Sequence, residues 1–204
     1  MKLVLATQNP NKVKEIQAVL PSSWSVTTAA EAGITDELPE TGDTLDANAR
    51  EKAAFLQAHT GGFALSDDSG LEVDALDGAP GVYSARYGGP EKDDALNRAA
   101  LLRAMDGQTH RSARFRTVVA WATPTGMATY EGVVEGTLLT TERGTGGFGY
   151  DALFVPLDGD GRTFAEMALE EKKAMSHRGR ALRAWMEDLG SEINPRSSKS
   201  GLRG

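Results

Sequence analysis

Two long segments rich in β-branched and aromatic residues lie next to each other in the middle of the chain. They run from Ala113 to Thr123 and from Met127 to Leu139, and only Pro124-Thr125-Gly126 separates them. Two such segments joined by a short turn predict a long antiparallel hairpin. The sheet cannot then be purely parallel, because it must contain this antiparallel pair.

Predicted strands and helices alternate on both sides of the hairpin. Short apolar runs predict strands over Lys2–Ala6, Phe63–Ser66 and Ala152–Val155. Apolar residues at helical spacing predict helices over 13–20, from an Asp43 cap to Gly61-Gly62, over 90–105, and up to Leu189. This alternation predicts an α/β fold with a mixed sheet flanked by helices.

The length favours one compact unit over several domains. The chain has 204 residues, within the roughly 100–200 residues of one ordinary domain. We assign residues 1–189 to a single α/β domain. From Gly190 onward the sequence has no periodic apolar pattern, so we expect residues 190–204 to form a mobile tail.

Charge and composition argue against several classes of protein. The net charge is −7, from 22 Lys and Arg against 29 Asp and Glu, and nucleic-acid or anionic-membrane binders carry basic fields instead. The absence of Cys excludes disulfides, thiolate metal sites and cysteine nucleophiles, and it is compatible with the cytoplasm. The longest apolar run is Val118–Ala122, and the opening apolar run is too short for a signal-peptide core. We therefore expect a cytoplasmic protein without a membrane span.

The segment Thr7-Gln8-Asn9-Pro10-Asn11-Lys12 stands between a predicted strand and a predicted helix. Amides at a helix N-terminus attract anions, and a nearby lysine adds a full positive charge, so the arrangement suits phosphate. It lacks the glycine spacing of a Walker A loop. An ordinary polar loop with a solvated lysine is the alternative.

Asp67-Asp68-Ser69-Gly70 follows the predicted strand Phe63–Ser66 and has the composition of an acidic turn. Adjacent carboxylates repel, so a cation or hydrogen-bond donors usually offset them. Mg²⁺ prefers such hard oxygen ligands, and a neighbouring carboxylate could take a proton from a bound water. Glu40 lies upstream as a further candidate carboxylate. The alternative is a solvated turn.

The segment Gly144 to Asp151 combines many glycines with Phe148 and Tyr150. Glycine lets the backbone approach a ligand closely, and the two aromatic rings offer flat faces on which a base could stack. A flexible hairpin connection is the alternative.

The segment Lys172 to Arg180 holds five cations if His177 is charged. In an acidic protein it forms a local positive field suited to a polyphosphate, although a solvated basic turn is equally consistent. Together the four segments supply the separate parts of a nucleoside triphosphate pocket. His59 and His110 lie in polar surroundings and are interpreted as surface residues.

Five motifs in the same order closely resemble the inosine triphosphate pyrophosphatase family, over residues 1 to about 189. They are Thr7-x-Asn9-x-x-Lys12, Ser66 to Leu71, Gly81 to Tyr87, Gly144 to Asp151, and Ser176 to Gly179. The resemblance implies an elongated mixed sheet with two lobes and a central active-site cleft. It also implies Mg²⁺ dependence, a homodimer, and hydrolysis of non-standard purine nucleoside triphosphates (ITP, dITP, XTP) to the monophosphate and pyrophosphate.

The resemblance also implies roles for individual residues. Asp68 would be the general base, with Asp67 supporting it, and Glu40 and Asp68 would hold the metal. Triphosphate contacts would come from Thr7, Asn9, Lys12 and Lys52. The remaining nucleotide-binding set would be Ser69, Phe148, Gly149, Tyr150, Asp151, Lys172, His177 and Arg178.

The mechanism we expect is attack on the α-phosphorus by a water that Mg²⁺ and Asp68 activate, while Lys12, Lys172 and Arg178 neutralise charge on the phosphate oxygens. Donors near His177 and Arg178 would favour a 6-oxo purine over adenine. A pyrophosphatase for dUTP or other modified nucleotides is the enzymatic alternative. A nucleotide sensor is a second alternative, which the Asp67-Asp68 pair disfavours because a pure triphosphate binder gains little from extra negative charge.

Overall fold

The chain forms one mixed six-stranded sheet, seen in a computed structural model that describes residues 1–7, 13, 16–17 and 20–193. The strand order is β2-β1-β3-β4-β5-β6; β1 pairs in parallel with β2 and β3, and the other pairs are antiparallel. The bounds are β1 Lys2–Leu5, β2 Ser25–Thr28, β3 Phe63–Val73, β4 Ser112–Thr123, β5 Gly126–Leu138 and β6 Phe154–Pro156. The predicted hairpin and mixed sheet are confirmed.

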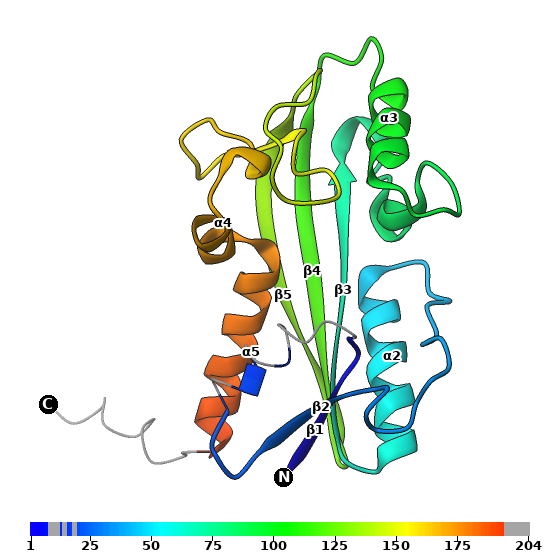
Figure 1. Ribbon diagram of the computed structural model, residues 1–204, viewed down its shortest axis with the longest axis vertical. Helices are drawn as coiled ribbons and strands as arrows, with labels where there is room; N and C mark the ends of the chain where they lie inside the picture. The colour runs from blue at the N-terminus through cyan, green and yellow to red at the C-terminus, as the bar shows by residue number, and fades with distance from the viewer. Residues whose placement is uncertain (8–12, 14–15, 18–19, 194–204) are drawn as a thin grey trace, which may run out of the picture.

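Helices cover the two faces of this long, narrow sheet (Figure 1). α2 (Leu45–Thr60) lies on one side of β3 and β4, and α5 (His177–Ile193) lies on the other side of β4 and β5. α3 (Asp94–Ala104) and α4 (Leu169–Met175) flank the upper half in this view, whereas β1 and β2 join the lower half. The elongated α/β architecture is therefore as expected. None of the helices in the described ranges is long and apolar enough to cross a membrane.

α2 shows how local sequence sets the element that carries much of the site. The side chain of Thr44, not the predicted Asp43, caps the helix by accepting a hydrogen bond from Ala47 N at 3.1 Å. Gly61 ends it in the left-handed region, with φ 65°. Leu45 and Leu56 belong to its buried stripe and pack on the sheet with small alanines. The small residues let the helix approach the sheet closely enough for its polar side chains to reach β3.

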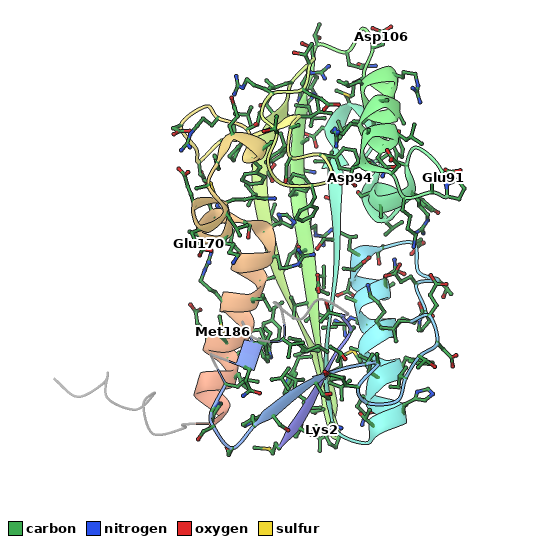
Figure 2. All side chains as sticks on the ribbon, viewed as in Figure 1. Lys2, Glu91, Asp94, Asp106, Glu170 and Met186 are labelled. Atoms are coloured by element: carbon green, nitrogen blue, oxygen red, sulfur yellow. The ribbon has the colours of Figure 1, made fainter. Side chains whose placement is uncertain are left out.

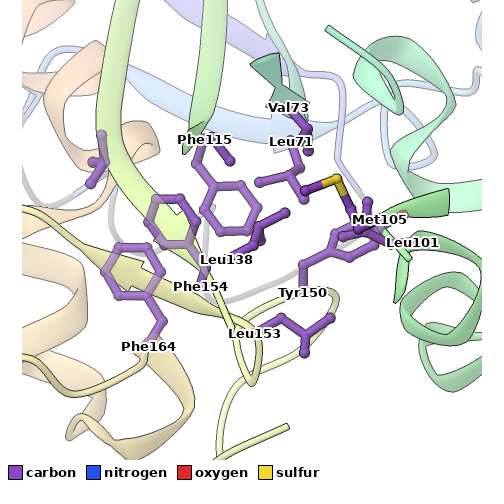
Figure 3. Packing of buried hydrophobic residues seen from close by; sticks show 12 residues of the cluster. Leu71, Val73, Leu101, Met105, Phe115, Leu138, Tyr150, Leu153, Phe154 and Phe164 are labelled. Atoms are coloured by element: carbon purple, nitrogen blue, oxygen red, sulfur yellow. The ribbon is translucent and has the colours of Figure 1, made fainter. Parts of the chain in front are cut away.

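Three apolar clusters pack helices against the sheet, one in the upper half of Figure 1 and two in the lower half. In the upper half, Leu71 and Phe115 of the sheet pack with Leu101 of α3 and Phe154 of β6 (Figure 3). In the lower half, α5 packs Trp185 against Trp121, while the α2 stripe covers the opposite face. Each large apolar side chain buried in this way contributes roughly 1.5–3 kcal/mol, so the strands between the clusters form a rigid frame.

Several predicted boundaries differ from the structure. β3 continues through Asp67-Asp68-Ser69-Gly70, which the sequence analysis interpreted as a turn, because β4 pairs with these residues one for one. The helix predicted over 90–105 starts only at Asp94, capped by Asp93. The strand predicted over 152–155 is β6, which runs from Phe154 to Pro156.

Other elements fall outside the predictions or outside the described residues. β2 was not predicted, and it extends the sheet beyond β1. Of the helix predicted over 13–20, residues 14–15 and 18–19 lie outside the described residues. α5 runs to Ile193, four residues past the predicted domain end at 189, and residues 194–204 lie outside the description.

Candidate active site

A buried lysine joins two carboxylates on the α2 side of the sheet. Lys52 Nζ donates to Asp68 Oδ1 at 3.1 Å and to Glu40 Oε1 at 2.7 Å. The side chains of Lys52 and Asp68 are 8% and 15% exposed, whereas that of Glu40 is 40% exposed. Lys52 therefore joins the less exposed carboxylate, that of Asp68, to the more exposed one, that of Glu40. The two carboxylates are close enough to contact a single cation.

Asn48 lies one turn before Lys52 on α2 and completes this arrangement. Its Nδ2 donates to Asp68 Oδ2 at 3.2 Å, and its Oδ1 accepts from Gly42 N at 2.8 Å. Glu51, in the next turn of α2, binds Thr41, the residue before Gly42. The backbone N and the hydroxyl of Thr41 both donate to the Glu51 carboxylate at 2.8 Å. Asn48 and Glu51 thus fix the loop that carries Glu40.

Burial and charge shift the pKa values of the central pair. Burial raises the pKa of Asp68, and the hydrogen bonds and charge from Lys52 and the bond from Asn48 oppose this only in part. Burial disfavours the charge on Lys52, but Asp68 and Glu40 outweigh it and raise the Lys52 pKa. At neutral pH Lys52 stays charged, and Asp68 is a stronger base than an exposed aspartate.

The carboxylates of Glu40 and Asp68 fit a magnesium ion whose coordination shell is completed by other ligands. Mg²⁺ is usually held by one or two carboxylates together with substrate phosphates and waters. The two carboxylates already share one cationic group, the ammonium of Lys52. The described residues hold no cluster of three or more His, Cys, Asp or Glu side chains arranged as a complete metal cage. A Mg²⁺ ion held by these two carboxylates would take its remaining ligands from waters and substrate phosphates.

Asp67 lies on the opposite face of the sheet from Asp68. Its Oδ2 accepts from Arg178 Nε of α5 at 2.9 Å, and Arg178 Nη2 donates to Ser69 Oγ at 3.3 Å. Successive side chains of a strand point to opposite faces, and β3 runs straight through both residues. The two carboxylates therefore do not form one pair on the same face of the sheet, because Asp67 binds Arg178 instead. The support of Asp68 by Asp67 stays a prediction.

Thr7, just past the end of β1, lies where the two faces of the site meet. It lines a cavity, the lower cavity, together with Glu40, Lys52 and Lys92. It also lines a small apolar cavity with Asp67 and Arg178. The other predicted phosphate contacts of this segment, Asn9 and Lys12, lie outside the described residues.

The predicted nucleotide-binding set comes together in a second cavity, the upper pocket. All eight residues of that set line it: Ser69, Phe148, Gly149, Tyr150, Asp151, Lys172, His177 and Arg178. They come from β3, the glycine-rich loop, α4 and the start of α5. Arg178 contacts Asp67 and Ser69 from here, so it connects the pocket to the middle of β3.

His177 is a buried neutral histidine in the wall of the upper pocket. Its ring stacks on Phe115, with the centroids 4.9 Å apart and the planes at 11°. Burial, reinforced by the charges of Arg178 and Lys172, lowers its pKa to about 3. His177 is therefore uncharged at neutral pH, and the basic segment holds four cations, not five. Its Nδ1 is buried without a hydrogen-bond partner among the described residues.

The glycine-rich loop presents one aromatic side chain and buries the other. Phe148 is 66% exposed, and Lys172 Nζ lies 4.5 Å from its ring centroid while forming an ion pair with Asp151. Tyr150 is only 3% exposed and donates its hydroxyl to Ser84 O at 2.8 Å, because its ring belongs to the upper apolar cluster (Figure 3). The predicted stacking surface is thus Phe148 alone, with Tyr150 as the anchor of the loop. Lys172 lies with the upper pocket, apart from Glu40 and Lys52.

A family comparison agrees with this geometry, since a model of the Ham1 family matches residues 3–188. The chain belongs to the Ham1 family. Among curated relatives, the dITP/XTP pyrophosphatase of Desulforamulus reducens is 51% identical over 193 residues, which cover 93% of this chain and 96% of that protein. A dITP/XTP pyrophosphatase of Thermus thermophilus is 51% identical over 192 residues, covering 92% of this chain and 91% of that protein.

Solved Ham1 structures share the fold. The Staphylococcus aureus Ham1 protein superposes with a TM-score of 0.90 at 33% identity, covering 94% of this chain and all 100% of that one. A structure titled nucleoside-triphosphatase, dITP/XTP pyrophosphatase, from Mycobacterium abscessus has a TM-score of 0.81 at 43% identity, covering 91% and 98%. The resemblance inferred from the five motifs is confirmed.

Two side chains that shape this Ham1 site, Asn48 and Phe115, were not among the predicted site residues. Asn48 is 2% exposed and lies on the buried side of α2, and its position directly before Ala49 of the apolar stripe is the one sign of this in the sequence. The ring of Phe115 stacks on the ring of His177, but an aromatic residue in a β-strand gives no such sign in the sequence. The predicted surface positions of His59 and His110 are confirmed, since both are exposed.

Proposed function

We propose that this chain hydrolyses non-standard purine nucleoside triphosphates, ITP, dITP and XTP, to the monophosphate and pyrophosphate. The names of its relatives support this, because both curated relatives described above are called dITP/XTP pyrophosphatases. The observation that carries the proposal is the neutral, buried His177 beside Arg178 in a pocket that opens onto Phe148.

The upper pocket is suited to a purine that carries a 6-oxo group. A neutral imidazole offers one donor and one acceptor, and a guanidinium offers only donors. Hypoxanthine and xanthine present an oxo acceptor to such donors, whereas adenine presents an amino group and would leave them unpaired. A buried donor without a partner costs enough to reject an analogue strongly. The exposed ring of Phe148 supplies a face for stacking.

The α2 side is suited to the triphosphate. Mg²⁺ held by Glu40 and Asp68 would supply a Lewis acid that neutralises charge on the phosphate oxygens. Lys52 keeps the two carboxylates together and adds a positive charge of its own. Thr7 joins this region to Arg178, so a nucleotide could extend from the upper pocket to the lower cavity.

Asp68 is the general base of the proposed reaction. It takes a proton from a water whose oxygen forms a bond to the α-phosphorus, while the bond from that phosphorus to the pyrophosphate oxygen breaks. Its raised pKa makes it a stronger proton acceptor at neutral pH. Lys52 and Asn48 hold its two oxygens, which limits the rotation of the carboxylate.

We further propose that the protein acts in the cytoplasm, in keeping with its lack of cysteine, and that it forms a homodimer, as its family resemblance implies. Light scattering on the purified protein tests the dimer. A mass near twice 21.7 kDa is expected, and a mass of one chain at assay concentrations would contradict it.

Product analysis tests the proposed reaction. The purified protein and Mg²⁺ are incubated with ITP, XTP, dITP, GTP, ATP and dUTP, and pyrophosphate and orthophosphate are scored separately. We expect pyrophosphate and monophosphate from ITP, dITP and XTP and little turnover of ATP. Orthophosphate as the first product would move the attack to another phosphorus, and preferred turnover of dUTP would replace the purine assignment.

A further inference from the structure

The glycine-rich loop is held from the side of the molecule opposite to α4 and α5. Asp94 Oδ2 accepts a hydrogen bond from Gly149 N at 2.7 Å, and Arg98 Nη1 donates to Gly149 O at 2.9 Å. Both side chains belong to α3. Figure 2 shows Asp94 at the end of α3 that faces the loop. The backbone N–H and the carbonyl of Gly149 are thus both hydrogen-bonded to side chains of α3. We call this pair of hydrogen bonds the grip.

The two α3 side chains are themselves fixed. They stand four residues apart, so they project from the same face of the helix. Asp93 caps α3 through Leu96 N at 2.8 Å, and Asp94 occupies the first turn, where the helix dipole favours a negative charge. Arg98 is 18% exposed on its side chain and forms an ion pair with Glu142 at 3.0 Å. The grip therefore comes from a rigid element.

Gly149, the residue held by α3, restrains the position of the neighbouring aromatic side chain, Phe148. Gly149 has φ 59°, a backbone conformation that residues other than glycine rarely adopt. It separates the exposed Phe148 from the buried Tyr150. On its other side, Phe148 N donates to Asp151 Oδ2 at 2.8 Å. Hydrogen bonds to charged groups are roughly twice as strong as neutral ones. The backbone on both sides of Phe148 is thus bound by carboxylates from two different parts of the fold.

We propose that Asp94 and Arg98 are positioning residues that hold the glycine-rich loop so that Phe148 meets the base, and that they thereby contribute to base selection. This inference rests on the proposed function. Asp94 also lines the upper pocket, so its carboxylate lies beside the ligand space as well as on the loop. A loosened loop would let other bases settle against Phe148, because the ring would no longer be confined to one place.

Hydrogen exchange of the nucleotide-free protein tests the grip without any activity. Exchange is followed in a peptide that covers residues 144–153. Asp94→Ala and Arg98→Ala should speed exchange there, by roughly 10-fold for Asp94→Ala, because a charge-assisted bond is lost. Asp94→Asn keeps an acceptor oxygen and should restore slow exchange. Asp106→Ala and Arg103→Ala, at exposed positions near the far end of α3, are the matched controls.

Steady-state kinetics with ITP and ATP test the consequence. Asp94→Ala and Arg98→Ala should raise KM for ITP by roughly 10-fold with a smaller change in kcat, and should lower the ITP:ATP ratio of kcat/KM. Equal loss for both nucleotides with unchanged exchange would overturn the inference. If the wild-type protein fails to hydrolyse ITP, the proposed function falls. The exchange result, which needs no nucleotide, still decides whether α3 holds the loop.

Discussion

Replacing Lys52 by methionine should destabilise the protein through charge rather than through packing. Methionine is of similar length and keeps the apolar contacts of the stem, so the change removes mainly the ammonium. That ammonium lies 3.1 Å from Asp68 Oδ1 and 2.7 Å from Glu40 Oε1. Without it Asp68, 15% exposed, remains a buried carboxylate with only Asn48 as a described donor.

The expected loss follows from the burial of each partner. Breaking a buried pair by removing one partner costs about 3–5 kcal/mol, whereas a pair with an exposed partner contributes about 0–1 kcal/mol. Glu40 is 40% exposed and adds little, and Asp68 keeps its bond from Asn48. We therefore expect the lower end, about 3 kcal/mol at pH 7, or a fall in Tm of about 6–12 °C for a chain of this size.

The pH dependence separates this cause from lost packing. The pKa of Lys52 is raised in the folded protein, so its contribution is present below the ordinary value of 10.5 and is lost as the pH rises through the folded value. In the variant, the pKa of Asp68 should rise further, because its cation is gone. The gap between variant and wild type should then be smaller at pH 4 than at pH 7, because a lower pH favours the protonated, uncharged form of Asp68.

Urea denaturation of wild type and Lys52→Met at both pH values measures the gap. Lys92→Met is the matched control, since Lys92 is an exposed lysine that lines the same lower cavity and should change stability by less than about 0.5 kcal/mol. A loss from Lys52→Met that is no larger than the control, or one that persists unchanged at low pH, would refute the electrostatic reasoning.

Three further predictions concern the same frame. Asp68→Asn should lower kcat by roughly 10²–10⁴, because it removes the group that takes the proton from the attacking water; steady-state kinetics checks this, and near-wild-type kcat would remove the base role. Wild type should lose about 2 kcal/mol of stability between pH 7 and pH 5, because the His177 pKa of about 3 in the folded protein means that the unfolded chain takes up the proton first. His177→Gln should remove this loss, which urea denaturation at the two pH values measures. Equal losses in the two proteins would contradict a buried neutral histidine. Gly132→Ala should cost about 1–3 kcal/mol, since a Cβ there would overlap the His177 carbonyl at the start of α5, whereas Gly126→Ala, with open space around it, should cost far less in the same denaturation assay.

Local patterns were enough to predict most of the frame. The β4–β5 hairpin and α2 follow from periodicity and end signals that lie within one continuous segment of the chain. β2 escaped prediction because Ser25–Thr28 contains only one apolar residue, Val26, whereas the equally short β1 contains three, and the place of β2 depends on β1. Asp67-Asp68-Ser69-Gly70 has the composition of a turn, but ten paired positions with β4 supply a continuous ladder that overrides local preference.

The sequence by itself determined which residue types were available and in what order, and the motifs were specific enough to indicate a family. Only the tertiary structure decided how they combine. Strand alternation sends Asp67 to Arg178 on one face and Asp68 to Lys52 on the other. Burial on Phe115 makes His177 neutral, and α3 grips a loop 55 positions away in sequence from Asp94. Each of these depends on contacts between distant segments, which no local pattern records.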